Sequence, residues 1–367
     1  MSDPLNPVPA TLKVGVVGVG WAGQQHLKAF AAIDGVEIIA VAGMEAEQLA
    51  TVQADYGIPH AFSRWEDLVE LQGLDAISVA VPTFLHAPIT VAALERGIHV
   101  LSEKPLARNG AEGAAMVAAA RKAGRVLEVV FNHRRRGDVK KLKNIIDDGD
   151  LGRPYYAKAS WLRRSGIPSL GSWFTNPELA GGGPMADIGV HVLDYALHLL
   201  GEPKAISVTA STYAELGPQG RGGSAGYTHA RSDHKFEVED FASAFIRLEG
   251  GVTLVLEAGW ASYRDPADLM DFRIYGTDGG AELRVSDSPE AAESGLRIFT
   301  DKDEANADYD AVPLENGNHQ SVVDDFVAAI RAGEENWGKH DGSVALTRAL
   351  IIDACYLSAQ ELREVRL

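Results

Sequence analysis

Aspartate and histidine alternate along the segment 181–201 at intervals of four, three and four residues, at Asp187, His191, Asp194 and His198. This spacing places the four side chains on one face of a helix. Histidine is the usual general acid or base near neutral pH. We therefore expect His191 to exchange a proton with a substrate, and Asp187 to orient His191 or bind a substrate hydroxyl. His198 lies near the end of the helix, where a cation interacts well with the helix dipole, so we expect a structural role for it.

Glycines around this helix predict a close approach of another group. Gly189 lies inside it, where glycine costs about 1 kcal/mol relative to alanine, and residues 181–183 are all glycine. We expect the triplet to let a ligand reach the helix N-terminus. A solvated helix face is the alternative, although such a face normally includes lysine or glutamate. No cysteine or third histidine has metal-ligand spacing, so we expect no metal site.

Lys104 lies in the segment Glu103-Lys104-Pro105, which directly follows the predicted strand 98–102. The carboxyl ends of parallel strands form the edge at which open sheets bind ligands, so this lysine is expected to lie beside a ligand. Its amine can stabilise a developing alkoxide or take part in proton transfer. A lysine in a surface loop is the alternative.

A dinucleotide-binding fingerprint, G-x-G-x-x-G, occupies residues 18–23 between a β-branched strand and a helix. Gly18 permits the tight turn, Gly20 lets the backbone approach a pyrophosphate, and Gly23 allows close packing of helix on strand. Helix N–H groups then face the phosphate oxygens. Trp21 and Ala22 complete the segment that we expect to contact the cofactor.

The end of the second strand bears on the choice between NAD and NADP. An acidic residue that binds the ribose is expected there, but the chain has Gly43 and Met44, followed by Glu45 and Glu47. No arginine or lysine is close in sequence, and a 2′-phosphate would meet carboxylates, so NAD is slightly favoured. The alternative is that both glutamates are ordinary first-turn acids, which a helix dipole favours.

Further cofactor contacts are expected at the same sheet edge. Val81, Pro82 and Thr83 follow a buried strand, His86 begins the next helix, and Glu103 precedes the lysine. For His86, a structural role at a helix terminus is an equal alternative.

Two different patterns of secondary structure position the candidate site residues. From residue 11 to about 131, β-branched runs alternate with helical patterns, which predicts a doubly wound parallel α/β sheet, a Rossmann domain, over 1–131. From Asn132 onward strands follow one another, which predicts an α+β domain with a large, mostly antiparallel open sheet over 132–367. Helices are expected over 319–332 and 343–364, and these C-terminal helices are candidates to pack on the first domain.

Composition excludes several classes of protein. The 367 residues are 46% hydrophobic and 23% charged, which is typical of a globular protein, and the net charge of −17 disfavours nucleic acid as a partner. Cys355 is the single cysteine, which fits a reducing compartment. The first 13 residues lack the pattern of a secretory leader, and no apolar run reaches the roughly 18 residues of a membrane helix. We expect a cytoplasmic protein.

The chain resembles the Gfo/Idh/MocA oxidoreductases, which include glucose–fructose oxidoreductase and inositol dehydrogenase. The resemblance covers nearly the whole chain and rests on KVGVVGVGWAGQQHL, VAVPTFLH, HVLSEKPLA, VVFNHRR, WFTNPELAGGGPMADIGVHVLDYALHLLG and VEDFASAFIRLEGG. It implies a Rossmann domain followed by an α/β domain whose open sheet often forms homodimers or homotetramers. It also implies catalytic roles for Lys104, Asp187 and His191, and a cis bond before Pro105.

The resemblance places Asn132, Trp173 and Asp194 where substrate-pocket residues often lie. Arg163, on a candidate strand, is a further substrate contact that would favour an acidic sugar, with an ordinary surface charge as its alternative. The implied activity is hydride transfer between nicotinamide and a carbinol or carbonyl carbon of a sugar, inositol or related polyol. Two alternatives remain open: a cofactor-dependent glycosidase with no net redox change, and a non-catalytic sensor of NAD(P). The chain departs from the family at Gly43-Met44, where many NAD-preferring members carry Asp.

Overall fold

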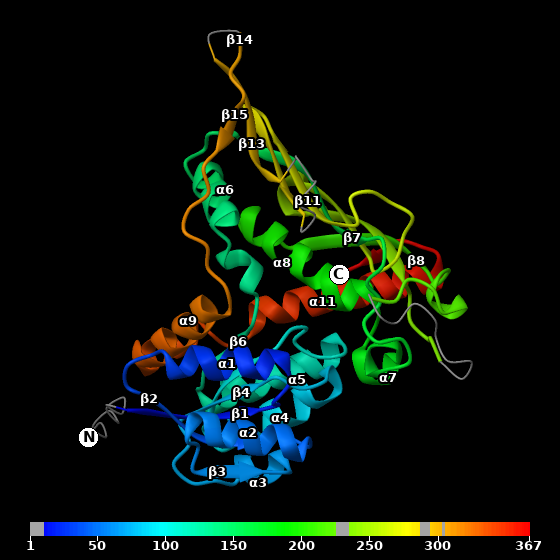
Figure 1. Cartoon of the computed structure of the whole chain (residues 1–367). Helices are drawn as coiled ribbons and strands as arrows, with labels where there is room; N and C mark the ends of the chain where they lie inside the picture. Colours follow the sequence, from blue (N-terminus) through cyan, green and yellow to red (C-terminus); the bar gives the residue numbers. More distant parts are fainter. Residues whose placement is uncertain (1–10, 225–234, 287–293, 303–304) are drawn as a thin grey trace. The chain divides into compact units, whose positions relative to one another are not determined.

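The computed structural model describes residues 11–224, 235–286, 294–302 and 305–367 (Figure 1). They form two compact units: the first comprises the chain up to Ala107, Ala111–Asn132 and Asn318–Leu346, and the second comprises Arg108–Gly110, His133–Gly317 and Thr347–Leu367. Most of the N-terminal stretch on which the expectation about a leader rests, residues 1–10, lies outside the described residues. The domain division at residues 131 and 132 stays a prediction.

The first unit is built on a six-stranded parallel sheet with the order β3-β2-β1-β4-β5-β6. Its strands are β1 (Leu12–Val17), β2 (Val36–Ala42), β3 (His60–Phe62), β4 (Ala76–Val79), β5 (His99–Ser102) and β6 (Leu127–Val129). Every residue of β4 and β5 is buried, as expected for strands covered on both faces. The order is that of a doubly wound nucleotide-binding sheet, so the predicted Rossmann fold is confirmed.

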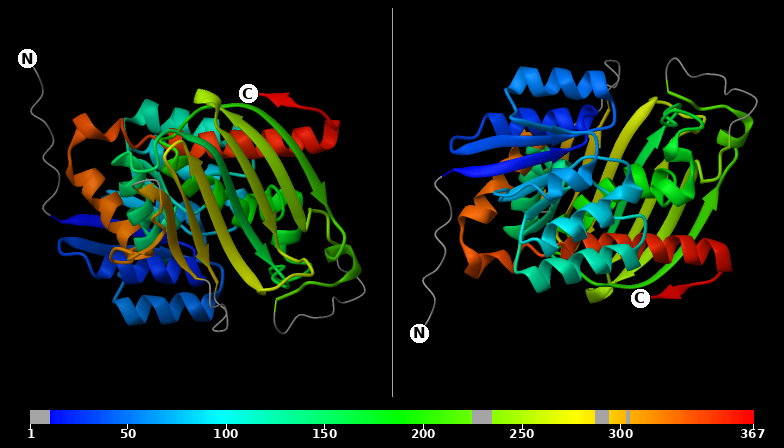
Figure 2. Two further views of the ribbon diagram at one scale, coloured as in Figure 1. Left: turned by 90° about the horizontal axis from the view of Figure 1, so that it is seen from above. Right: turned by 90° about the horizontal axis from the view of Figure 1, so that it is seen from below.

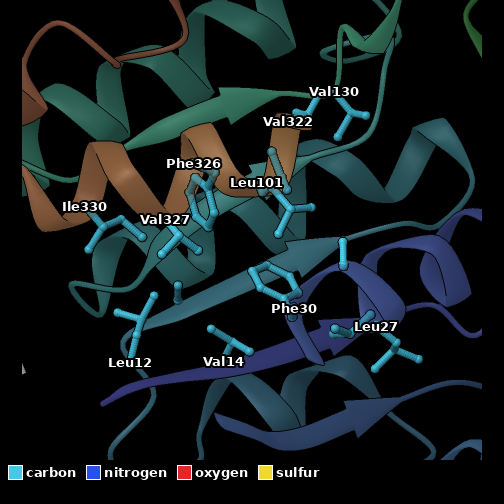
Figure 3. Packing of buried hydrophobic residues seen from close by; sticks show 14 of the residues in the cluster. Leu12, Val14, Leu27, Phe30, Leu101, Val130, Val322, Phe326, Val327 and Ile330 are labelled. Atoms are coloured by element: carbon cyan, nitrogen blue, oxygen red, sulfur yellow. The ribbon is translucent and has the colours of Figure 1, made fainter. Parts of the chain in front are cut away.

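Helices from both ends of the chain cover this sheet. They are α1 (Trp21–Ala31), α2 (Ala46–Tyr56), α3 (Trp65–Val69), α4 (His86–Glu95), nearly all of α5 (Gly110–Ala123), α9 (His319–Arg331) and α10 (Glu334–Trp337). The apolar face of α9 packs beside α1, where Phe326 meets Phe30 edge to face at 6.5 Å (Figure 3). A segment about 290 residues from α1 in sequence thus completes the core of the first unit.

The second unit contains a ten-stranded sheet. Its strands are β7 (Pro154–Arg163), β8 (Ala205–Tyr213), β9 (Phe241–Leu248), β10 (Thr253–Gly259), β11 (Asp268–Gly276), β12 (Gly279–Val285), β13 (Gly295–Lys302), β14 (Ala305–Asn306), β15 (Tyr309–Ala311) and β16 (Val365–Arg366). The order is β14-β13-β12-β11-β7-β10-β9-β8-β16, with β15 beside β13. Among the described pairs, β7 and β10 run parallel and the others run antiparallel. The predicted mostly antiparallel sheet is confirmed.

One face of this sheet is buried. Alternate residues of its central strands point inward, among them Ala159, Leu256 and Phe272, each fully buried. The helices of the unit are α6 (Gly137–Asp147), α7 (Pro177–Ala180), α8 (Val190–Leu199) and most of α11 (Ser343–Glu361). The broad sheet and the neighbouring α11 are seen in Figure 2. Trp161 and Arg163 hold inward positions at the carboxyl end of β7, where they join the candidate site.

Candidate functional site

The glycine turn after β1 has the shape that a dinucleotide requires. A Cβ at Gly18 would lie 2.0 Å from the carbonyl oxygen of Ala80, and one at Gly23 would lie 1.9 Å from that of Gly18. By contrast, a Cβ at Gly20 would meet no heavy atom within 4 Å. Gly20 caps α1 without a side-chain hydrogen bond, and the first turn of α1 has no acidic residue. The turn therefore offers open backbone N–H groups to an anionic pyrophosphate, so the residues fit the cofactor.

The end of β2 explains the missing aspartate. A Cβ at Gly43 would lie 2.8 Å from Cγ2 of Val19, a stiff β-branched side chain on the glycine turn, so an aspartate here requires Val19 to move. Met44 is 82% exposed beside it. Glu45 occupies the N-cap position of α2 but makes no capping hydrogen bond. Both residues follow β2 at the ligand edge of the sheet, and their contact with a ribose stays a prediction.

His86 contacts the two loops that follow β4 and β5 at the sheet edge. Its ring is 1% exposed, and its two nitrogens lie 2.9 Å from the carbonyl oxygen of Val81 and 2.8 Å from that of Pro105. Burial lowers the pKa of this imidazole. The geometry favours the structural alternative for His86. Thr83 is buried beside it, whereas Pro82 is half-buried.

Glu103 and Lys104 follow β5 at the same edge. The peptide bond between Lys104 and Pro105 is cis, as the resemblance implies. The carboxylate of Glu103 accepts a hydrogen bond of 3.0 Å from the backbone N–H of Lys104 and lies 3.2 Å from the ring of His26. Lys104 itself is half-buried. Because Glu103 accepts its backbone N–H, the backbone of Lys104 is held in place by the preceding residue at the end of β5.

The polar helix of the second unit begins with a π-helical turn, Met185–Gly189, which the regular spacing did not predict. Asp187 lies in this turn, and its Oδ2 accepts a hydrogen bond of 2.9 Å from the indole of the fully buried Trp260. A rigid donor at the end of β10 therefore orients the carboxylate. His191 lies on the first turn of α8 and is 8% exposed.

Aromatic side chains surround His191. Its ring meets that of His133 at 4.6 Å and that of Trp161 at 5.8 Å between centroids. The guanidinium of Arg163 lies 4.7 Å from the Trp161 ring. Asp268 accepts hydrogen bonds from Trp161 at 2.7 Å and from Arg163 at 3.0 Å. This carboxylate balances the arginine charge, which removes the basis for expecting an acidic sugar.

The expectation that glycines open this helix to a ligand is wrong. A Cβ at Gly182 would lie 2.0 Å from the hydroxyl of Tyr356, and one at Gly183 would lie 2.1 Å from the carbonyl oxygen of Glu239. The Glu239 carboxylate accepts hydrogen bonds from Gly183 N at 2.9 Å, Met185 N at 3.1 Å and Tyr356 Oη at 2.8 Å. Protein groups therefore fill the space at the helix N-terminus.

Gly189 is also explained by packing. A Cβ there would lie 3.0 Å from the Cβ of Ala258 on β10, so the close approach comes from the sheet. The structural role expected of His198 stays a prediction, but its ring is not the cation that a favourable interaction with the helix dipole would need. Burial, with the charge of Arg134, lowers the pKa of this imidazole to about 4, so it is neutral near neutral pH.

Asp194 lies in a buried ionic network. It is 1% exposed and accepts hydrogen bonds from Arg134 and, at 3.0 Å, from Arg348, which also binds Glu202. The network joins α8 to α11. Two arginines thus engage the carboxylate, and this geometry favours a structural role over the predicted contact with substrate.

The change Asp194→Asn is expected to lower the free energy of unfolding by about 3 kcal/mol, because it leaves two arginines beside a neutral amide. Urea unfolding measures this change. Asp147→Asn is the control, because Asp147 pairs with Lys143 at an exposed position and its loss is expected to cost less than about 0.5 kcal/mol. If the Asp194→Asn variant had normal stability and a much higher KM, Asp194 would be a substrate contact and not a structural residue.

The remaining predicted contacts lie at half-buried positions. Trp173 stacks on Phe174 at 3.8 Å, and Phe174 packs on the cluster that contains Trp260. Asn132 begins the short 3-10 turn at 132–135 in the first unit. Their contacts with substrate stay predictions.

The sequence analysis missed three residues that contact candidate site residues: His26 lies beside Glu103, Trp161 beside His191, and Trp260 donates to Asp187. His26 follows the glycine fingerprint by three residues, Trp161 lies near the carboxyl end of β7, and Trp260 directly follows β10, so position alone could have drawn attention to them. Among the described residues, no cluster of three or more His, Cys, Asp or Glu has a metal-binding arrangement. Every described helix is too short or too polar to traverse a lipid bilayer.

Comparison with protein families gives two matches. A model described as "Oxidoreductase family, NAD-binding Rossmann fold" matches residues 12–131, and one described as "GFO/IDH/MocA C-terminal domain" matches residues 139–282. Together they cover well over half of the chain.

Similar proteins are named as sugar dehydrogenases. A D-glucoside 3-dehydrogenase of Escherichia coli (strain K12) is 33% identical over 273 residues, 74% of this chain and 77% of the relative. A levoglucosan dehydrogenase of Pseudarthrobacter phenanthrenivorans is 31% identical over 284 residues, 73% of this chain and 72% of the relative. A solved levoglucosan dehydrogenase in complex with NADH has a TM-score of 0.82 at 24% identity, covering 97% of this chain and 99% of that one. This structural likeness supports the fold.

Proposed function

Since this chain belongs to the Gfo/Idh/MocA family of oxidoreductases, we propose that it is an NAD(P)-dependent dehydrogenase or reductase. Its substrate is a sugar, inositol or related polyol, and its reaction interconverts a carbinol and a carbonyl. The observation that carries the proposal lies in the first unit: Lys104 follows β5 at the sheet edge that also holds the open glycine turn.

Each candidate catalytic side chain has a distinct task. The bound nicotinamide supplies hydride chemistry at the substrate carbon. The Lys104 amine stabilises the negative charge on the substrate oxygen. The imidazole of His191 takes or returns the hydroxyl proton. Asp187, held by the Trp260 indole, binds a neighbouring hydroxyl or orients His191.

The substrate class follows from the aromatic surroundings of His191. Trp161 and His133 are half-buried rings beside His191, a type of side chain that can pack on sugar C–H groups, while Asp268 balances the charge of Arg163. A neutral sugar or polyol therefore fits this cluster better than a sugar acid. The sugar names of the relatives support the same class.

A spectrophotometric screen of neutral sugars, glycosides, inositols and sugar acids with NAD and NADP tests this function. We expect one neutral class to give stoichiometric NADH. Cleavage of a glycoside without net NADH would identify the glycosidase alternative. Tight binding of NAD(H) without turnover of any compound would identify the sensor.

The change Met44→Arg is expected to raise the preference for NADP over NAD, measured as the ratio of kcat/KM values, by about tenfold or more. The guanidinium would pair with the 2′-phosphate at the end of β2. Met44→Leu is the control and should leave the ratio unchanged. An unchanged ratio in the arginine variant would place the ribose away from Met44.

We further propose a cytoplasmic protein, on the basis of its single cysteine, which fits a reducing compartment. We also propose a homodimer or homotetramer formed through the open face of the large sheet. On that face β9 presents Ser243, Phe245 and Arg247, which alternate along the strand with the buried residues of the opposite face. Light scattering of the purified protein tests the assembly, and a monomer at micromolar concentration would contradict it.

A further inference from the structure

His26 lies in the first unit beneath the sheet edge and has no place in the glycine fingerprint. It belongs to α1 and is 0% exposed. Its Nδ1 lies 2.5 Å from Oγ of Ser78 on β4, and its Nε2 lies 3.2 Å from Oε1 of Glu103. The second contact has an ion-pair distance without the angle of a straight hydrogen bond. The imidazole thus bridges two strand-end positions.

The carboxylate of Glu103 continues this chain of contacts to Lys104. While Oε1 faces His26, Oε2 accepts the backbone N–H of Lys104 at 3.0 Å. The carboxylate therefore holds the backbone from which the proposed catalytic amine extends. Glu103 is 9% exposed, so an ionised carboxylate here needs partners.

The charged and titratable groups around Glu103 come from several elements. His26 lies on α1, His319 begins α9, His86 begins α4, and Lys104 is adjacent in the chain. Burial acts to raise the pKa of the Glu103 carboxyl, but the contact with His26 and the charges of His26, Lys104 and His319 outweigh it and lower the pKa.

We propose that His26 is a positioning residue, which keeps the carboxylate of Glu103 turned toward the backbone of Lys104 and so fixes the catalytic amine. This inference rests on the proposed role of Lys104. Without His26, Glu103 loses a neighbour that offsets its burial, and its carboxyl pKa rises. A protonated Glu103 holds the backbone N–H of Lys104 less strongly, and a rotated one no longer accepts it, so catalysis suffers while the glycine turn stays intact.

Three substitutions separate the contacts of His26. His26→Gln can place an amide N–H near the position of Nε2 and so keep the contact with Glu103. His26→Asn reaches only as far as Nδ1 and keeps the contact with Ser78. His26→Leu keeps the bulk and removes both. His99→Leu is the control, because His99 is buried in the same unit but packs on Trp337.

Steady-state kinetics, NADH fluorescence titration and the pH dependence of kcat are measured for each variant. We expect kcat to fall about 10- to 100-fold in the leucine and asparagine variants, with NADH affinity within about threefold, and to recover to within about fivefold in the glutamine variant. The activity depends on ionised Glu103. A raised carboxyl pKa therefore moves the acidic limb of the kcat profile upward, by about one pH unit or more. His99→Leu should lower stability without moving this limb.

An infrared carboxyl band, identified with Glu103→Gln, follows Glu103 independently of turnover. We expect the protonated band to appear at higher pH in His26→Leu than in the unmodified chain. Unchanged kcat and pH profile in a folded His26→Leu variant would overturn the inference, as would equal losses in the glutamine and leucine variants. Failure of the unmodified protein to oxidise any sugar or polyol would instead overturn the proposed function, and the role assigned to His26 with it.

Discussion

Replacement of Lys104 by alanine is expected to lower kcat by roughly 10²- to 10⁴-fold, with the affinity for NADH within about threefold. The Lys104 amine follows β5 at the sheet edge that we propose to bind the cofactor, and its loss leaves the developing negative charge on the substrate oxygen without this partner. The glycine turn that we propose to bind the pyrophosphate is untouched. NADH absorbance gives kcat, and NADH fluorescence gives the affinity.

Two further lysine variants refine this result. Lys104→Arg keeps the positive charge, but a guanidinium does not release a proton near neutral pH. Partial recovery in this variant would assign the amine an electrostatic role, and no recovery would favour a role in proton transfer. Lys122→Ala, at an exposed position on α5, is the control and should retain full activity. Near-normal turnover of Lys104→Ala would remove Lys104 from the catalytic assignment.

Substitution of His191 by asparagine is expected to lower kcat by roughly 10²- to 10³-fold, because the amide cannot take up the hydroxyl proton. NADH affinity should not change, because this residue belongs to the second unit and not to the glycine turn. Steady-state kinetics with the best substrate of the screen measures the effect.

His198→Asn is a matched control for His191→Asn on the same helix. The pKa of His198 is about 4, so its ring is neutral through the neutral range, and its loss should leave the pH profile near neutrality unchanged. Equal losses of kcat in the two variants would indicate damage to α8 rather than removal of an acid or base.

The local pattern of apolar and polar residues was sufficient to predict most of the fold. The alternation of apolar strands and amphipathic helices predicted the Rossmann sheet, because parallel strands buried on both faces appear as continuous apolar runs. The sequence of β12 and β13 does not stand out as strand, because outward residues such as Glu282 and Arg297 interrupt the apolar pattern. The short helices α7 and α10 have too few residues to show a period.

The candidate site was predictable where chemistry and position coincided in sequence. Lys104 and the glycine turn each follow a strand, so topology alone places them at one edge. The role of the glycine triplet was not predictable, because Glu239, which fills the helix N-terminus, lies 56 residues beyond Gly183. The bridge from His26 to Glu103 was missed for the same reason: contacts distant in sequence leave no local pattern.

A crystal structure with NAD(H) and the best sugar or polyol of the screen tests the central claim most directly. We predict that the Lys104 amine and the His191 imidazole both lie about 3 Å from one hydroxyl oxygen, whose carbon faces the nicotinamide ring. A nicotinamide ring turned away from the sugar, or an amine and an imidazole that contact different parts of it, would contradict the account.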